Sequence, residues 1–502
     1  MRKKVKFLNN NDVIGYVFGE TRVDELSFLA KKPPKVGDYV IINYNDNKIL
    51  GMVESTILGS RALDGVSDVE YLEKIKDFVN DTYYIKGKIK VLGDIENLKL
   101  PRIPPEPGTP IYLADKETLK RVFGNGHIKI GHLITREDIE VKLDVNKLCS
   151  RHLAILAMTG MGKSNTVSIL LKELSKLRAT ILVFDMHGEY VNIKCNSQKI
   201  PINIIHPKIN VYEIDDERFC DLAGIDRQAT KQRPYVQKAI HEVKNNKKQS
   251  DFANVEEYLD EIISVLERYL DENEKDKSSI QTAIFRIEHM KHFKKKILTI
   301  NYNPVKDIKE HHVNILPLES LDEYEVDVVV SYLSKSILDS RKELIIENRE
   351  LAKPIFLIFE EAHLIVPKNR DTEAKRYLGR IAREGRKFGV GLCLVSQRPK
   401  GLDADVLSQC SNLIISKLIE PSDQKHVQAA SEALSDDLMK QLTSLNIGEA
   451  IILGPCVKVP ALVKIDEFDG ERGGEDLDLV KLWSREEEKK DFDDNIFGDD
   501  DF

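Results

Sequence analysis

The chain has 502 residues, of which 41% are hydrophobic and 31% are charged, and its formal net charge is −8 at pH 7. This length allows several domains with substantial cores. The negative net charge excludes a protein coated uniformly with basic groups for nucleic acid, but it leaves room for a local basic channel. No apolar run approaches the roughly 20 residues that a membrane span needs. The first ten residues lack the apolar stretch of a secretory signal.

The cysteines point to a reduced environment. Six of them are scattered along the chain without a CxxC pair or zinc-ligand spacing: Cys149, Cys195, Cys220, Cys393, Cys410 and Cys456. We therefore expect free thiols, a cytoplasmic location and no membrane role without a partner.

Residues 1–100 alternate apolar and polar positions in short runs that are separated by turn signals, for example at residues 33–38. This rhythm predicts an N-terminal antiparallel β-barrel. A proline-rich segment at residues 101–110 and further strand patterns predict a linker and joining strands over residues 101–148.

From residue 149 the pattern changes to buried strands that alternate with helices, which predicts an α/β domain with a largely parallel sheet covered on both faces. We assign this domain to residues 149–209 and 301–470. Residues 210–300 are expected to form a helical insertion, because they carry apolar residues at helical spacing. The distance in sequence between Lys163 and Glu360 is also long for a minimal nucleotide-binding fold. Residues 471–502 form an acidic C-terminal tail.

Residues 157–164 follow an apolar strand and precede a helix, which is the context of a phosphate-binding loop. Its glycines let successive N–H groups point at a β-phosphate. Lys163 places a charge between the β- and γ-phosphates, and Ser164 supplies a hydroxyl ligand to Mg²⁺. Ala157 replaces the first glycine of the usual pattern. The sequence thus predicts a nucleoside triphosphate and Mg²⁺ as ligands, with nucleotide contacts from Thr159, Gly160, Met161, Gly162, Lys163, Ser164 and Asn165.

Two acids end the apolar strand at residues 355–359. In phosphate-loop enzymes this edge faces the nucleotide, so we assign Glu360 to Mg²⁺ through water and Glu361 to orienting and deprotonating the attacking water. Gln397 ends the next strand, where a polar side chain can sense the γ-phosphate or hold that water.

Basic residues crowd between positions 375 and 400, where Glu384 is the one acid among Lys375, Arg376, Arg380, Arg383, Arg386, Lys387, Arg398 and Lys400. An arginine finger acting on a neighbouring subunit explains such an excess, and so does contact with a polyanion. Arg151, before the phosphate-loop strand, is placed to face the nucleotide or an interface. From charge alone, we assign contacts with such a polyanion to Lys368, Arg370, Arg398 and Lys400.

The chain resembles the archaeal HerA ATPases over essentially its whole length. The motifs that carry this resemblance lie at residues 151–164, 184–190, 360–363, 380–389 and 396–401. The resemblance implies a RecA-like P-loop NTPase core behind a HAS-type barrel. It implies a homo-hexameric helicase or translocase on double-stranded DNA, which acts with a NurA nuclease in DNA-end resection for homologous recombination.

The resemblance also assigns roles to single residues. Lys163 and Ser164 bind nucleotide and Mg²⁺, Glu361 is the catalytic base, and Arg386 is the finger that acts in trans. Arg151 approaches the nucleotide across the ring. Asp185 and residues 187–189 lie beside the site.

Two other classes of function remain open. One is a secretion- or conjugation-type ring ATPase that moves protein or DNA, and the other is a nucleotide-switched assembly factor. The paired acids and the candidate finger favour turnover over switching.

Overall fold

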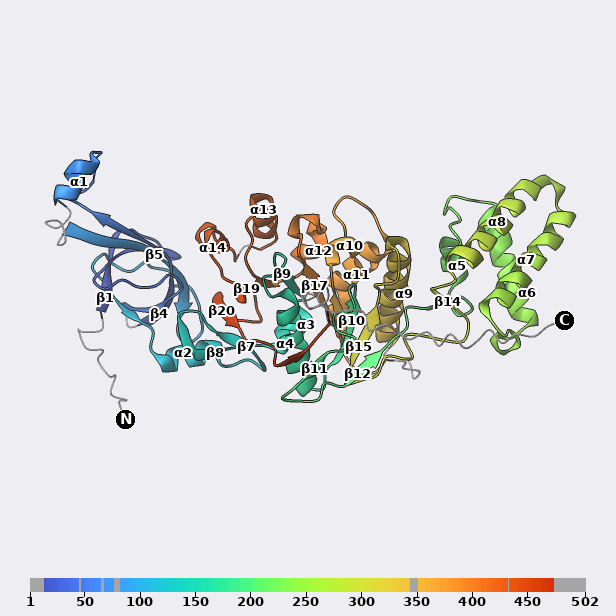
Figure 1. Cartoon of the computed structure of the whole chain (residues 1–502), viewed down its shortest axis with the longest axis horizontal. Helices are drawn as coiled ribbons and strands as arrows, with labels where there is room; N and C mark the ends of the chain where they lie inside the picture. Colours follow the sequence, from blue (N-terminus) through green and yellow to red (C-terminus); the bar gives the residue numbers. More distant parts are fainter. Residues whose placement is uncertain are drawn as a thin grey trace, which may run out of the picture.

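The computed structural model describes residues 13–44, 47–64, 67–75, 82–343, 351–431 and 433–473, so the acidic tail beyond residue 473 lies outside the described residues. The molecule is elongated, with a barrel at one end, a sheet-based core in the middle and a helical lobe at the other end (Figure 1).

A closed antiparallel barrel forms the N-terminal end. Its strands are β1 (Val13–Thr21), β2 (Glu25–Ala30), β3 (Tyr39–Tyr44), β4 (Asn47–Ser60), β5 (Tyr83–Asp94) and β6 (Pro110–Leu113), in the order β1-β2-β5-β4-β3-β6. Phe28, Ile42 and Ile89 fill its interior. Strand β6 pairs with both β1 and β3. The barrel therefore runs to residue 113, beyond the expected boundary at residue 100, because its closing strand comes after the proline-rich segment.

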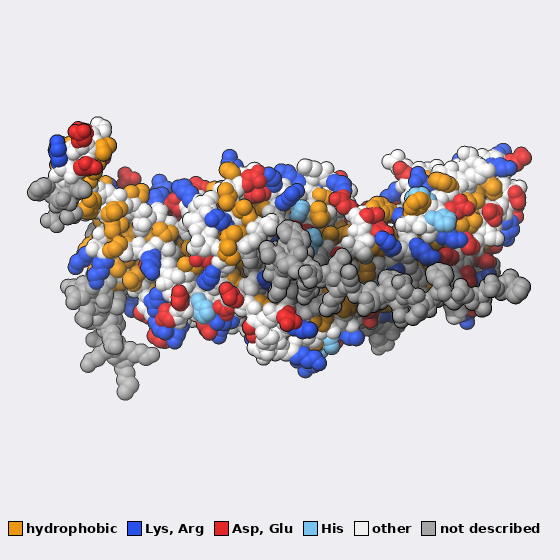
Figure 2. Space-filling model, in the orientation of Figure 1, with side chains coloured by type: hydrophobic (Ala, Val, Ile, Leu, Met, Phe, Trp, Pro, Cys, Tyr) orange, Lys and Arg blue, Asp and Glu red, His pale blue; other side chains and the backbone are white. Residues whose placement is uncertain are grey.

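The barrel also carries an exposed apolar surface. Helix α1 (Val69–Ile75) lies between β4 and β5. The exposed apolar side chains on and near this hairpin include Ile57, Leu58, Val69 and Tyr71. Figure 2 shows hydrophobic side chains gathered over this end, whereas charges of both signs are interspersed over the helical lobe.

An eleven-stranded sheet forms the core. Its order is β12 (Ile202–Ile204), β15 (Val313–Pro317), β10 (Thr180–Asp185), β16 (Ile355–Phe359), β17 (Val390–Ser396), β9 (Leu153–Leu156), β18 (Asn412–Ile415), β19 (Glu449–Leu453), β20 (Ala461–Ile465), β7 (Ile128–Leu133) and β8 (Arg136–Leu143). Neighbours from β12 to β18 run parallel, and those from β18 to β8 run antiparallel. The central strands are buried along their length, as parallel strands covered on both faces must be.

The segment that we expected to join the domains is thus divided between them. Strand β6 belongs to the barrel, while β7 and β8 extend the core sheet. Helix α2 (Lys116–Phe123) lies between them and packs against β8. Its N-terminus is capped by Asp115, which accepts a hydrogen bond from the Thr118 N–H (2.8 Å).

Helices cover the core sheet. They are α3 (Val145–Ser150), α4 (Lys163–Lys176), α9 (Glu323–Lys342), α10 (Ala362–Ile365), α11 (Glu373–Phe388), α12 (Ala404–Ser408), α13 (Pro421–Ala430) and α14 (Asp436–Gln441). Helix α4 buries Val167, Leu170 and Leu174 in one continuous apolar core with the strands. This is the P-loop NTPase fold expected from the sequence.

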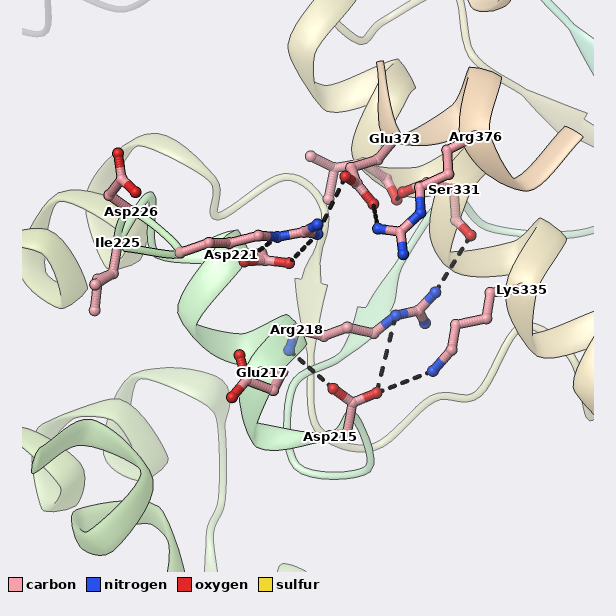
Figure 3. Close-up of polar contacts among 12 residues, drawn as sticks. Asp215, Glu217, Arg218, Asp221, Ile225, Asp226, Ser331, Lys335, Glu373 and Arg376 are labelled. Atoms are coloured by element: carbon pink, nitrogen blue, oxygen red, sulfur yellow. Dashed lines mark hydrogen bonds and ion pairs between the residues drawn. The ribbon is translucent and has the colours of Figure 1, made fainter. Parts of the chain in front are cut away.

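The helical lobe contains α5 (Asp216–Leu222), α6 (Gln232–Asn246), α7 (Val255–Glu272) and α8 (Lys277–Phe293). A short parallel pair, β13 (Ile209–Asn210) with β14 (Leu298–Thr299), closes its base. The lobe meets the core through charged contacts (Figure 3). Figure 3 shows Asp215 paired with Lys335 on α9 (3.1 Å). Arg227 pairs with Asp221 (2.8 Å) and with Glu373 on α11 (3.1 Å). Such partly exposed pairs contribute at most about 1 kcal/mol each.

Among the described residues, the structure contains no helix that is both long and apolar enough to cross a membrane. All six cysteines are free thiols.

A buried histidine ties the phosphate-loop strand to its neighbours. His152 Nδ1 accepts a hydrogen bond from the Leu392 N–H of β17 (3.1 Å), so Nε2 carries the proton and donates to the Ala382 oxygen of α11 (3.0 Å). Its side chain is 2% exposed. Burial lowers the pKa of His152 to about 4, and the Ala382 hydrogen bond opposes that shift.

This histidine makes core stability depend on pH. Because the folded-state pKa lies below the unfolded value of about 6.5, its contribution is complete above pH 6.5 and falls as the pH drops toward 4, by up to about 3 kcal/mol. We expect His152→Asn, which tolerates the positive φ of 56° at this position, to flatten this dependence. The measurement is the apparent free energy of unfolding between pH 7.5 and 4.5. Equal slopes for the two proteins would contradict the assignment.

Candidate functional site

The candidate site lies at the carboxyl edge of the parallel strands. The phosphate loop follows β9, and Glu360, Gln397 and Asp185 lie where β16, β17 and β10 end. The register aligns these ends, because Ser396 pairs with Leu156 and Phe184 pairs with Phe359. Parallel strands finish at the same edge, so residues that are far apart in the chain converge here.

The phosphate loop has the backbone shape that anion binding requires. Gly160 and Gly162 have φ values of 76° and 97°, a region that side chains with a Cβ rarely adopt. Gly162 is the N-cap of α4 and makes no side-chain capping hydrogen bond, and the first N–H groups of a helix have no partner within the helix. The loop and helix together form an N-terminal anion site for phosphates.

The loop lysine is paired with the candidate base. Lys163 donates from Nζ to Glu361 Oε1, and the two side chains are 7% and 5% exposed. Gln397 Nε2 donates to the same oxygen (2.8 Å), and the Thr159 hydroxyl donates to Gln397 Oε1. Four predicted site residues from three strand ends therefore form one hydrogen-bonded cluster. A triphosphate on the loop would compete with Glu361 for Lys163.

Glu361 occupies a strained backbone position, with φ 42° and ψ 44°. A residue with a Cβ is disfavoured there by about 1–3 kcal/mol, and such outliers concentrate at functional sites. Because of this turn, the side chains of the consecutive residues Glu360 and Glu361 contact different partners. Glu361 contacts Lys163 and lies 3.3 Å from His363 Nδ1, whereas Glu360 contacts Tyr190.

Glu360 lies in a second, more acidic cluster. It is fully buried, and Oε1 accepts a hydrogen bond from the Tyr190 hydroxyl (3.1 Å). Burial raises the pKa of Glu360 to about 8, and the charge of Glu189 adds to the shift while Lys163 opposes it. Asp185 accepts hydrogen bonds from the N–H groups of His187 (3.3 Å), Glu189 (3.1 Å) and Tyr190 (2.9 Å).

This acidic cluster fits a divalent cation. Glu360 Oε2 and Glu189 Oε2 are buried without a hydrogen-bond partner among the described residues. Buried carboxylate oxygens without partners are costly, and Mg²⁺ takes oxygen ligands. Ser164, at the start of α4, adds the hydroxyl that the sequence pattern predicts. Sequence reasoning noted Asp185 and Glu189 without a role and missed Tyr190, although all three lie in one of the recognised motifs.

A cavity of about 660 Å³ opens over the phosphate loop. This volume is within the range of small-molecule sites. Its walls include Glu189 and Gln397, and a second set of lining residues comes from the far end of the described chain: Ile447, Gly448, Lys464, Phe468 and Arg472. Sequence reasoning missed this second set, because no motif marks it.

Arg151 and Arg386 lie at the opposite edge of the sheet. Arg151 ends α3 just before β9, and Arg386 lies in the last turn of α11 just before β17. Ser150 and Arg386 line a separate cavity of about 370 Å³. Arg151 thus precedes β9, whose far end leads into the phosphate loop. Arg386 precedes β17, whose far end leads to Gln397. Neither arginine is among the described residues that line the cavity over the phosphate loop of its own chain.

The basic excess on α11 is partly neutralised by acids from elsewhere. Lys375 pairs with Asp403 (3.0 Å), and Arg376 and Arg380 pair with acids of their own helix. Arg383, Arg386 and Lys387 make no ion pair with a described residue.

The predicted DNA loops lie side by side. Pro367 and Leu402 form an isolated antiparallel bridge, and the Lys368 N–H donates to the Gly401 oxygen (2.8 Å). Lys400 pairs with Glu420, and Arg370 pairs with Glu323 (2.8 Å). Arg398 lies next to the site, where its N–H donates to the Ser396 hydroxyl (3.1 Å).

Comparisons with known proteins agree with this architecture. Residues 14–97 match the HAS barrel domain, residues 128–337 match the central domain of the helicase HerA, and residues 336–463 match the HerA-like C-terminal domain. A "probable helicase" of Methanocaldococcus jannaschii is 66% identical over 98% of this chain and 99% of its own length. The DNA double-strand break repair helicase HerA of Saccharolobus solfataricus is 40% identical over 95% of this chain and 97% of its own length.

Among solved structures, VirB4 of Thermoanaerobacter pseudethanolicus aligns with a TM-score of 0.49 and 13% identity, covering 68% of this chain and 97% of that chain. The matched domains follow one another along the chain in the order of the barrel, the phosphate-loop half and the Gln397 half of the core. The chain belongs to the HerA helicase family.

Proposed function

We propose that this chain is the subunit of a homo-hexameric ring that hydrolyses ATP to move along double-stranded DNA. The chain is an ATP-hydrolysing enzyme of the HerA family. The observation that carries the proposal is the separation of parts: Lys163, Glu361 and Gln397 meet at one edge of the sheet, while Arg386 lies at the other. A ring in which one subunit's arginine edge meets the next subunit's nucleotide edge brings the two together.

The chemistry follows from the contacts at the nucleotide edge. When the triphosphate takes Lys163, Glu361 keeps its hydrogen bond from Gln397 and is free to orient water and accept its proton. Ser164 and Glu360 would hold Mg²⁺, Glu360 through water. A cation held there would supply positive charge beside the phosphates. Phosphate-loop contacts are assigned to Thr159, Gly160, Met161, Gly162, Lys163 and Ser164, whereas the Asn165 side chain is engaged elsewhere.

Arg386 of one subunit would reach the γ-phosphate on the next, with Arg151 beside it. Its lack of an ion pair among the described residues supports a partner outside its own chain. Loss of the γ-phosphate removes this contact, so the interface has two states that hydrolysis can switch.

The adjacent loops that carry Lys368, Arg370, Arg398 and Lys400 are the proposed DNA contacts. Contacts of this kind reach the phosphate backbone, so binding should be independent of sequence and weakened by salt. Relatives are named DNA double-strand break repair helicases. We therefore propose a role in DNA-end resection for recombination, together with a NurA-type nuclease.

ATP hydrolysis with and without blunt duplex DNA tests this function. We expect duplex DNA to stimulate the wild-type rate several-fold, and Glu361→Gln to lower both rates by at least about 100-fold, since general-base catalysis typically supplies that much. Changing Lys368, Arg370 and Lys400 together to Ala should abolish the stimulation, while the DNA-free rate stays within about twofold.

Two outcomes would contradict the proposal. A ring-sized wild-type species whose hydrolysis ignores DNA would favour a motor for another cargo or a nucleotide-switched assembly factor. If duplex DNA still stimulated ATP hydrolysis fully in the variant that lacks Lys368, Arg370 and Lys400, these loops would not be DNA contacts.

Mixing subunits tests the role of Arg386. If the arginine acts on a neighbour, each Arg386→Ala subunit disables a site that it does not own, so its presence should disturb wild-type neighbours. We expect activity in mixed rings to fall faster than the wild-type fraction. The readout is steady-state ATPase over a series of mixing ratios, with Glu471→Ala subunits as the control. A fall in simple proportion to dilution would argue against action in trans.

A further inference from the structure

The chain crosses α4 after the last core strand and returns toward the nucleotide site. We call residues 466–473 the strap. It follows β20 and contains β21 (Gly470–Glu471), which pairs antiparallel with β11 (Lys194–Cys195). Asp469 pairs with Lys172 on α4 (2.6 Å). The strap is thus fastened to the helix that the phosphate loop begins.

Asn165 clamps the first half of the strap. Its Nδ2 donates to the Asp466 oxygen (2.8 Å), and its Oδ1 accepts a hydrogen bond from the Phe468 N–H (2.9 Å). Both ends of the side-chain amide are therefore committed to the strap rather than to a ligand. Because Asn165 directly follows the residues of the phosphate loop, this clamp fixes the strap relative to the loop.

Gly473 fixes the other end of the strap beside the acidic cluster. Its N–H donates to the Glu189 oxygen (2.8 Å). A Cβ at Gly473 would lie 2.7 Å from the Gly188 oxygen, so the strap lies directly on that backbone. The strap therefore spans the cavity from the start of α4 to the segment that carries Glu189.

Arg472 faces this cavity. Successive side chains of an extended segment point to opposite sides. Glu471 accordingly faces solvent, with 78% of its side chain exposed, while Arg472 lines the cavity over the phosphate loop. The Nη1 atom of Arg472 is buried without a hydrogen-bond partner among the described residues. Glu189 Oε2, on the same cavity, also lacks a partner, so the two groups do not satisfy each other.

A buried guanidinium nitrogen without a partner costs free energy unless a ligand supplies an acceptor. The cavity is built for a ligand rich in acceptors, because the phosphate loop forms its other wall. The planar fork of arginine matches phosphate oxygens, which it can bind through two parallel hydrogen bonds.

We propose that the strap is the second wall of the nucleotide site and that Arg472 is a phosphate ligand. Lys163 holds the triphosphate from the loop, and Arg472 holds it from the strap. Bound nucleotide thereby joins the start of α4 to the end of the described chain. This assignment requires nucleotide binding only, so it stands or falls independently of DNA translocation.

Equilibrium binding of a fluorescent ATP analogue with Mg²⁺ to the full-length oligomer tests the assignment. We expect Arg472→Ala to raise Kd by about 10-fold or more, as loss of a charge-assisted hydrogen bond does. Arg472→Lys should restore part of the loss, because it keeps the charge without the fork. Glu471→Ala, a neighbour on the solvent side of the strap, should stay within about twofold of wild type.

A second measurement on the wild-type protein guards against a variant that fails to fold. Hydrogen exchange of backbone amides in residues 466–473 should slow when ATP and Mg²⁺ are added, because the ligand bridges strap and loop. Unchanged affinity of a folded Arg472→Ala protein, or unchanged exchange in the strap, would overturn the proposal.

Discussion

The buried ion pair between Lys163 and Glu361 is the contact on which the rest of the site depends. Removing one partner of such a pair leaves an uncompensated buried charge and typically costs about 3–5 kcal/mol. In the nucleotide-free protein, Glu361 therefore neutralises Lys163. In the mechanism that we propose, ATP would replace Glu361 on Lys163 and would release Glu361 to act as the base. Nucleotide binding and the release of the base would then be coupled through one ammonium group.

The common direction of the parallel strands determines where the other residues of the proposed site lie. Every strand that contributes to the site ends at the nucleotide edge, and the segments that carry Arg151 and Arg386 enter at the other edge. His152 locks this arrangement by bonding β17 and α11 at once. Because Arg151 and Arg386 lie at the edge away from the phosphate loop of their own chain, this geometry is the main argument for the ring that we propose.

The sequence predicted most of the nucleotide edge, because its signals are local. A strand, a glycine turn and a Lys-Ser pair occupy consecutive residues. Glu360 and Glu361 together follow one apolar strand, and Gln397 follows the next one. The barrel was likewise predicted from the alternation of apolar and polar residues. The helical lobe was predicted from apolar residues at helical spacing. The sequence did not show that part of the basic excess on α11 is neutralised, because Asp403, which pairs with Lys375, comes from another element.

What the sequence did not reveal depends on contacts between distant segments. Asn165 meets the strap across about three hundred residues, and neither segment carries a pattern that predicts the other. The closing barrel strand β6 is short and begins with a proline, so it resembled a linker. The left-handed backbone of Glu361 is imposed by the strand-to-helix turn and leaves no signature in residue type.

A double-mutant cycle on Lys163 and Glu361 tests the central claim most directly. The apparent free energy of unfolding would be measured without nucleotide for wild type, Lys163→Ala, Glu361→Ala and the double variant. A buried ion pair predicts that the double variant loses less than the sum of the single losses, with a coupling of about 1–3 kcal/mol. Additive losses, within about 0.5 kcal/mol, would show that the two residues do not hold each other before ATP binds, and would contradict the account.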